Sequence, residues 1–196
     1  MAGQIIYFLR HGETDWNAEG RIQGHADVPL NDRGRAQAAR NGQALRALRL
    51  DLRALDFVAS PLMRARETME IVRRELDVDP HSYRTDDILK EVHYGTFQER
   101  TWQEINVTDA ALVERRNADP YNWVPPGPGG ESYAMLEERI SRWHDGLTQD
   151  TVCVAHGGIM RVLHRAVGGL TEREAVTLRA PQDKVLVIES GRLSWL

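Results

Sequence analysis

The chain has 196 residues, a net charge of -4 at pH 7 and 41% apolar residues, a profile typical of one globular domain. A negative net charge excludes an overall positive potential of the kind that attracts nucleic acid. No apolar run approaches the roughly 20 residues that a membrane span needs. The first residues lack the basic region of a signal peptide, and the single Cys153 is compatible with a reducing compartment. We therefore expect one domain over residues 1–196, a cytoplasmic location, and neither a nucleic-acid nor a membrane partner.

Apolar periodicity in the first half of the chain predicts strands that alternate with helices. Residues 4–9 form a short apolar run typical of a buried strand, and apolar residues at helical spacing predict a helix over 31–50. A second buried strand is expected over 56–60, and Pro61 suits the start of a helix expected over 62–76.

The second half continues this alternation after an irregular stretch. We expect extended or loop structure over 81–92, helix over 100–118 and, from its Pro and Gly content, a loop over 124–130. The later elements are predicted as a helix over 131–147, a strand in TVCVAHGG, a helix over 159–167 and two final strands around Ser190-Gly191. Strands that alternate with helices predict an α/β domain with a mainly parallel sheet.

Three of the predicted strands run directly into polar residues or glycine. Arg10-His11-Gly12 follows the first strand, Ser60 follows the second with Arg64 one helical turn further on, and His156-Gly157-Gly158 follows a third. In parallel α/β sheets, ligands bind beyond the carboxyl ends of the strands. If these strands are parallel neighbours, we expect the two arginines and two histidines to converge on one edge of the sheet.

This mixture of side chains suits phosphate chemistry. Guanidinium groups neutralise the non-bridging oxygens of a phosphoryl group. A neutral imidazole can attack phosphorus, and a carboxylic acid can protonate a leaving alkoxide. His11, His156 and Glu91 also resemble a metal-ligand set, but Arg10 and Arg64 would repel a dication and no HxxxH or HxH spacing is present. We therefore expect no metal and no cofactor.

Five blocks of the sequence resemble the histidine phosphatase superfamily, also called phosphoglycerate mutase-like proteins. They cover nearly the whole chain in the family's order: LRHGET with Asn17, RIQGHADVPLNDRGRAQA, SPLMRARETMEI, LKEVHYGTF and VAHGGIMRVL. The resemblance implies a three-layer αβα sandwich around the mainly parallel sheet.

The resemblance also implies a role for individual residues. His11 resembles the nucleophile that becomes phosphohistidine, Glu91 resembles the general acid, and three further side chains resemble the phosphate pocket, namely Arg10, Arg64 and His156. Auxiliary contacts to phosphate or substrate are implied for Asn17, Gln23 and the backbone amide of Gly157. The acid is the least secure assignment, because other carboxylates lie nearby in the sequence: Glu13, Asp86, Asp87 and Glu99.

The sequence also departs from the family's pattern. Phosphatase-like members often follow the acid motif with Trp-Glu-Gly, whereas this chain has Phe97-Gln98-Glu99-Arg100. The HYG at 93–95 is similar to the mutase branch, but the longer insert of that branch before the second histidine is missing. Trp102, Trp123 and the loop over 124–130 occupy the place of a substrate lid.

The leading hypothesis is a metal-free phosphomonoesterase that acts on a small phosphorylated metabolite through phosphohistidine. A phosphoglycerate mutase is the alternative within the same fold. A non-catalytic domain that binds a phospho-ligand is a third alternative, which the presence of both His11 and Glu91 disfavours, because a binder needs neither nucleophile nor acid. The expected partner is a small phosphate ester, and the oligomeric state is open, with a homodimer among the alternatives.

Overall fold

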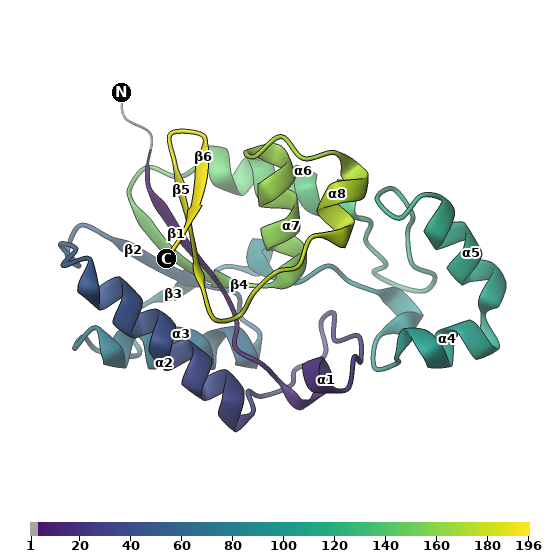
Figure 1. The fold of residues 1–196 in the computed structure, drawn as a ribbon, viewed down its shortest axis with the longest axis horizontal. Coiled ribbons are helices and arrows are strands. Elements are labelled where there is room, and N and C mark those ends of the chain that lie inside the picture. Colours follow the sequence, from purple (N-terminus) through teal and green to yellow (C-terminus); the bar gives the residue numbers. More distant parts are fainter. Residues whose placement is uncertain (1–3) are drawn as a thin grey trace.

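The computed structural model describes residues 4–196 and contains a six-stranded sheet in the order β3-β2-β4-β1-β5-β6 (Figure 1). The strands are β1 (Ile6–Arg10), β2 (Asp56–Ala59), β3 (Arg84–Thr85), β4 (Thr151–Ala155), β5 (Val185–Glu189) and β6 (Arg192–Trp195). The first four strands are parallel, whereas β5 runs antiparallel to β1 and β6 antiparallel to β5. The prediction of an α/β fold with a mainly parallel sheet is confirmed.

Helices cover both faces of this sheet, which gives the three expected layers (Figure 1). Alternate residues of β1 face opposite cores, because successive side chains of a strand point to opposite faces. Tyr7 and Leu9 pack in one core with side chains of α2 (Asp32–Ala47) and α3 (Met63–Glu75). Ile6 and Phe8 pack in the other core. The helices of that second layer are α6 (Tyr133–Asp145), α7 (Gly157–Ala166) and α8 (Glu172–Thr177).

Several predicted boundaries shift in the structure. The helix expected over 100–118 consists of two helices, α4 (Trp102–Thr108) and α5 (Ala110–Ala118), which meet at Asp109. α7 begins two residues earlier than expected, directly after His156, whose extended backbone makes it the N-cap. The sequence reasoning missed α1 (Asp15–Ala18) and α8, although the T-x-x-E pattern at the start of α8 is a readable capping box. Short 3-10 turns occur at η1 (Asp87–Leu89) and η2 (Gly95–Phe97).

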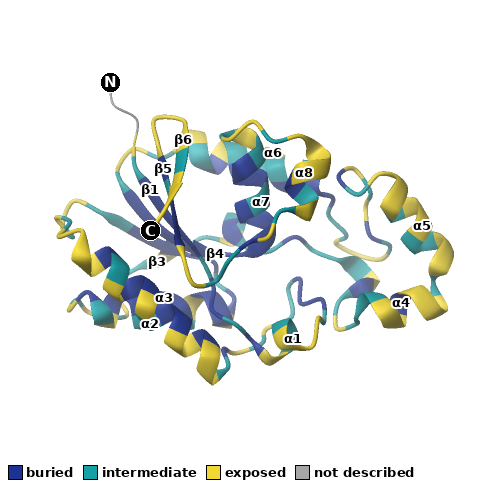
Figure 2. Cartoon of the chain, in the orientation of Figure 1, coloured by how far each residue is buried: buried dark blue, intermediate teal, exposed yellow. Residues whose placement is uncertain are grey.

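Residues 95–124 form an arm that extends away from the sheet and carries α4 and α5 (Figure 1). A small core lies between the arm and the loop that follows α1, and it consists of Phe97 and Ile105 from the arm and Ile22 from that loop. Most residues of α4 and α5 are exposed or only partly buried, as their yellow and teal segments show in Figure 2. This part of the fold is therefore held by far less buried surface than the sandwich.

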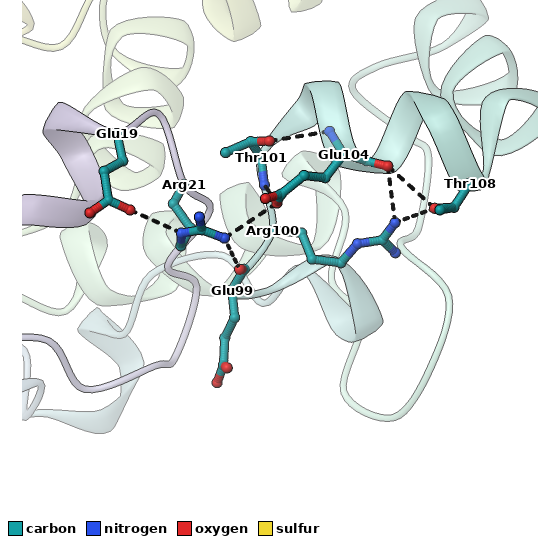
Figure 3. Close-up of polar contacts among 7 residues, drawn as sticks. All are labelled: Glu19, Arg21, Glu99, Arg100, Thr101, Glu104 and Thr108. Carbon is teal, nitrogen blue, oxygen red and sulfur yellow. Dashed lines mark hydrogen bonds and ion pairs between the residues drawn. The ribbon is translucent and has the colours of Figure 1, made fainter.

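The arm is joined to the loop that follows α1 by polar contacts around Arg21 (Figure 3). The Nη1 group of Arg21 donates to the carbonyl of Glu99 at 2.6 Å and contacts the carboxylate of Glu104 at 3.3 Å. Backbone bonds reinforce this joint, because the N–H of Ile22 donates to the carbonyl of Arg100 and the N–H of Glu99 donates back to the carbonyl of Ile22.

Across residues 4–196, none of the helices has both the length and the apolar composition needed to cross a membrane.

Candidate active site

The carboxyl ends of three adjacent parallel strands bring the predicted site residues together. β4 lies between β2 and β1, so Ser60, His156 and His11 follow neighbouring strands. The pairing continues one residue past the strands, since the N–H of His11 donates to the carbonyl of Ala155 at 2.9 Å and that of Ser60 donates to the carbonyl of Val154 at 3.0 Å. The centroids of the His11 and His156 rings are 5.2 Å apart.

The protonation state of His11 follows from its two ring nitrogens. Nδ1 lies 2.7 Å from the carbonyl oxygen of Gly12, which can only accept, so Nδ1 carries the proton. Nε2 accepts a hydrogen bond from Nε of Arg64 at 3.3 Å. Burial, followed by the charges of Arg64 and Arg10, lowers the pKa of His11 well below its usual value. The ring is therefore neutral at pH 7, and its lone pair is on Nε2.

Arg10 and Arg64 place two cations in this largely buried region. Arg64 is fully buried, and its two terminal nitrogens donate to the carbonyls of Ala26 and Gly24, both at 2.8 Å. Arg10 donates to the carbonyl of Ala180 at 2.7 Å, and its buried Nε has no hydrogen-bond partner. Burial lowers the pKa of each arginine to about 10, so both remain charged at neutral pH.

Neither arginine forms an ion pair with any carboxylate in residues 4–196. Their hydrogen-bond acceptors are neutral backbone carbonyls, which orient each guanidinium without cancelling its charge. The charge of Glu91 partly offsets the cost of burying these two cations, and a bound anion would offset it further. Within the same described residues, no group of three or more His, Cys, Asp and Glu side chains is arranged to hold a metal ion.

His156 is oriented by Ser60, a residue to which the sequence reasoning gave no role. Nε2 of His156 lies 2.7 Å from Oγ of Ser60. The N–H of Leu62 donates to the same hydroxyl oxygen at 3.4 Å, so Ser60 is itself held in place. The other ring nitrogen of His156, Nδ1, is buried without a partner. His156 thus has an unpaired ring nitrogen in a pocket beside His11.

Glu91 reaches the same place from the segment before the arm. Both of its carboxylate oxygens lie 3.1 Å from the backbone nitrogen of Gly158, in the first turn of α7, where the helix dipole favours negative charge. A Cβ at position 158 would come within 2.3 Å of Oε1 of Glu91 and displace its carboxylate, so glycine there allows the close approach. The acid and the His156-Gly157-Gly158 block are therefore adjacent.

The other carboxylates considered from sequence are directed elsewhere. Glu13 pairs with Arg33 at 3.3 Å, Asp86 with Arg84 at 3.2 Å, and Asp87 with Lys90 at 3.0 Å. Glu99 is exposed in the arm. Of these candidates, Glu91 alone contacts the helix that follows His156, and the geometry therefore favours it as the acid.

Two further side chains hold the backbone of Glu91, and the sequence gave no local signal for either. Nη2 of Arg139, in α6, donates to the carbonyls of Lys90 at 2.7 Å and Glu91 at 3.3 Å. The Nε of Arg139 pairs with Glu131 at 2.7 Å, which fixes the guanidinium. Nε2 of His25 donates to the same Glu91 carbonyl at 2.7 Å. These contacts fix the position of the segment from which the Glu91 side chain projects.

The auxiliary residues lie around this centre with different contacts. Oδ1 of Asn17 accepts from the side-chain amide of Gln182 at 3.0 Å, and the same amide contacts the carbonyl of His11 at 3.2 Å. Gln182 is another residue that sequence reasoning missed. Gln23 is buried beside Gly24, and its Oε1 has no hydrogen-bond partner. Gly157 begins α7, so its N–H has no acceptor within the helix and is open to an anion.

Comparison with known proteins agrees with this arrangement. The model of the histidine phosphatase superfamily (branch 1) matches residues 6–195. Phosphoglycerate mutase-like protein 4 of Arabidopsis thaliana is 36% identical over 169 residues, which cover 81% of this chain and 69% of that protein. Probable phosphoglycerate mutase GpmB of Salmonella choleraesuis is 30% identical over 201 residues, which cover 97% of this chain and 87% of that protein.

Solved structures show the same fold. TTHB049 from Thermus thermophilus has a TM-score of 0.74 and 31% sequence identity, with 97% of each chain covered. A putative alpha-ribazole-5'-P phosphatase from Escherichia coli has a TM-score of 0.82 at 23% identity, covering 99% of this chain and 95% of that one. The resemblance seen in the sequence motifs is confirmed over nearly the entire chain, and this protein belongs to the histidine phosphatase superfamily (branch 1).

Proposed function

We propose that the protein is a phosphomonoester hydrolase that acts through a phosphohistidine on His11. The observation that carries this proposal is the state of that ring, which is neutral and has its lone pair on Nε2, where its only hydrogen bond is the 3.3 Å contact from the buried Arg64. An imidazole in this form can attack phosphorus, and the arginine charges favour a bound phosphate ester. Membership in a superfamily of phosphatases and mutases supports an enzyme of this type.

The proposed reaction has two steps. Nε2 of His11 bonds to phosphorus while the ester P–O bond breaks, and Glu91 in its acid form gives its proton to the leaving oxygen. Water then attacks phosphorus, the P–N bond breaks, and the Glu91 carboxylate takes a proton from the water. Arg10 and Arg64 stabilise the charge on the phosphoryl oxygens in both steps, and the unpaired Nδ1 side of His156 adjoins the same place.

A phosphoglycerate mutase is the second candidate, because two relatives carry that activity in their names. In a mutase, the phosphohistidine returns its phosphoryl group to another hydroxyl of the substrate, and water must be kept out meanwhile. This chain lacks the longer insert that the mutase branch has between the acid and the second histidine, which favours transfer to water. The substrate class proposed is a small phosphorylated metabolite.

The test is a panel of phosphorylated metabolites assayed for phosphate release, with and without a chelator, and combined with rapid quenching at alkaline pH. We expect release from at least one alkyl monoester, unchanged activity in chelator, and an acid-labile phosphoryl group that mass spectrometry maps to His11. Complete loss in chelator that a divalent ion restores would overturn the metal-free mechanism.

The alternatives give different results in the same assay. With 3-phosphoglycerate and a catalytic amount of its bisphosphorylated primer, interconversion to 2-phosphoglycerate that outruns any phosphate release would identify a mutase. Tight binding of phosphate esters without phosphohistidine and without turnover would identify a non-catalytic binding domain.

A further inference from the structure

A cavity of about 510 Å³ lies near the amino ends of β2 and β4, at the end of the sheet opposite to His11. Its lining comes from the first residues of β2, the start of β3, the last turn of α3 and the loops that precede β2 and β3. The volume falls within the roughly 300–1,000 Å³ that is usual for small-molecule sites. The cavity is therefore large enough for a ligand and lies apart from the candidate active site.

Arg73, in the last turn of α3, is the most buried charged side chain of this cavity. The residue is 6% exposed, and its guanidinium lies over the ring of Phe57, 4.3 Å from the ring centroid. Its Nε donates to the carbonyl of Asp79 at 2.7 Å. The guanidinium is thus held at one face and at one edge, and the fork of Nη1 and Nη2 is its free end.

This fork has no partner of its own. Among residues 4–196, no group accepts a hydrogen bond from Nη1 or Nη2 of Arg73, and no carboxylate lies within ion-pair distance. Neither nitrogen is sealed from solvent, so a ligand in the cavity can reach them. The charge of Asp79 acts on Arg73 from a distance, and the Asp79 carboxylate accepts from the N–H of His81 at 3.0 Å. A free guanidinium fork binds a carboxylate through two parallel hydrogen bonds.

The other charges that line the cavity already have partners. Arg84 donates to the carboxylate of Asp56 from Nε at 3.0 Å and from Nη2 at 2.7 Å. His81 is exposed, and its Nδ1 lies 3.8 Å from Glu70. Within the described part of the chain, Arg73 is therefore the lining arginine whose charge no adjacent carboxylate cancels. One fork with one positive charge matches the two oxygens and the single charge of a carboxylate.

Apolar side chains form another wall of the cavity. Leu52, Leu55 and Val78 line it, and each is only partly buried against the core beneath α2 and α3. The side chain of Tyr83 lines it as well. A ligand bound to Arg73 has apolar surface beside it to remove from water, whereas a bare inorganic anion would leave that surface uncovered.

We propose that this cavity binds a small carboxylic acid with an apolar body. The carboxylate lies on Nη1 and Nη2 of Arg73, and the body lies against Leu52, Leu55 and Val78. This proposal is independent of the proposed function, because no residue that lines the cavity belongs to the proposed reaction centre.

The test compares three probes: 3-phenylpropionate, its uncharged amide, and acetate, which has the charge without the body. Each is titrated into the parent protein, and binding is followed in two-dimensional amide NMR spectra. We expect 3-phenylpropionate to bind with a Kd of about 1 mM or tighter, and at least about tenfold more tightly than the amide or acetate. The resonances that shift should belong to residues 52–57 and 78–84, and those of 10–12 and 156–158 should stay in place.

Arg73→Met keeps an apolar stem beside Phe57 and removes the fork, so the acid should lose its advantage while binding of the amide stays unchanged. Arg74→Met is the matched control, because Arg74 is exposed in the same turn of α3 and does not line the cavity. Ser82 is exposed where it lines the cavity, so Ser82→Trp should fill the space and abolish binding of the acid, whereas Ser82→Ala should bind it like the parent. Thermal unfolding verifies that each variant folds.

Any of three results would overturn the proposal. The first is equal affinity of the parent for acid and amide, or no binding of the acid up to about 10 mM. The second is a set of shifts confined to residues around His11 and His156, which would place the acid on the arginines there. The third is an advantage of the acid that persists in Arg73→Met. If Arg73→Met does not fold, unchanged binding of the acid to Ser82→Trp has the same force.

Discussion

The proposed phosphate pocket and the arm over residues 95–124 differ in how their side chains are held. In the pocket, His11, Arg64 and His156 are at most 2% exposed, and each has a fixed hydrogen-bond partner. In the arm, α4 buries one side chain, Ile105, and α5 buries none (Figure 2). The pocket is fixed by these hydrogen bonds. The arm is held by the small core of Ile22, Phe97 and Ile105, by Tyr121 near its end, which packs in the main core, and by surface ion pairs such as those in Figure 3.

This difference separates two tasks of the molecule. The proposed chemistry at phosphorus would require reacting atoms held in one geometry, and the backbone contacts at the sheet edge hold these side chains in that way. A segment with few buried contacts opens locally at low cost in free energy, and such segments commonly carry substrate recognition. We therefore expect changes in the pocket to alter rate, and changes in the arm to alter local stability.

The largest effect is expected from His11→Asn. The asparagine amide can still donate to the carbonyl of Gly12 but has no nucleophilic nitrogen, so turnover should fall by about a thousandfold or more while the fold survives. Phosphate release and thermal unfolding measure the two parts. A purified variant with a near-parental rate would remove His11 from the mechanism, and the contrast with the arm would lose its basis.

The next effect is expected from Glu91→Gln and depends on the leaving group. An alkoxide needs a proton to leave and an aryl oxide does not, so hydrolysis of alkyl phosphates should slow by about 10²–10⁴ while aryl phosphates change little. The ratio of kcat/KM for the two classes is the measurement. An equal loss for both classes would mean that Glu91 acts through structure alone, since its carboxylate also accepts from Gly158 at 3.1 Å.

Phe97→Ala is expected to destabilise the arm, and the loss of stability should be confined to it. Phe97 is fully buried and its ring stacks on Trp123 at 5.5 Å between centroids. Removing a buried phenyl group costs about 3–5 kcal/mol, and Phe97 is one of three buried side chains in this small core. We therefore expect the arm to unfold locally. Hydrogen exchange should accelerate over residues 95–124 and stay slow in β1 and β4. Phe57→Ala, in the main core, is the matched control and should lower the unfolding temperature of the whole protein.

The pH dependence of stability should come from the pocket. Burial, followed by nearby positive charge, lowers the pKa of both His11 and His156 well below 6.5. As the pH falls, these histidines therefore take up protons in the unfolded chain before they do so in the folded protein. Their contribution to the free energy of unfolding is fully present above about pH 6.5 and is lost as the pH falls below it. Each histidine contributes up to about 1.4 kcal/mol per pH unit in that window. We would measure the free energy of unfolding in urea at several pH values. Between about pH 6.5 and lower pH, it should fall less steeply with pH in His11→Asn than in the parent. An identical pH dependence in the two proteins would contradict the buried neutral state of His11.

The smallest effect is expected from Arg21→Ala at the joint of the arm. Its partners Glu19 and Glu104 are about half exposed, and ion pairs at such sites contribute little. We expect the unfolding temperature to change far less than in Phe97→Ala and the rate on aryl phosphates to match the parent. A large loss in either measurement would show that the polar contacts of Figure 3, rather than the apolar core, hold the arm.

The sequence by itself determined the elements of the sandwich and the residues at its edge. Apolar runs and helical spacing are local properties, and β1, β2 and β4 are buried enough for a short run to identify them. The Arg-His-Gly and His-Gly-Gly blocks directly follow their strands, so the prediction that they converge needed only a parallel sheet. Local pattern was weaker in the arm, where the break at Asp109 divides a continuous helical prediction.

Only the tertiary structure decided which atoms of those residues face one another. The proton on His11 is placed by the carbonyl of Gly12, the ring of His156 is oriented by Ser60, which lies 96 residues away, and the backbone of Glu91 is held by Arg139 from 48 residues away. Gln182 reaches His11 across 171 residues. Such contacts depend on side-chain directions after the chain has closed on itself, and no local propensity encodes them.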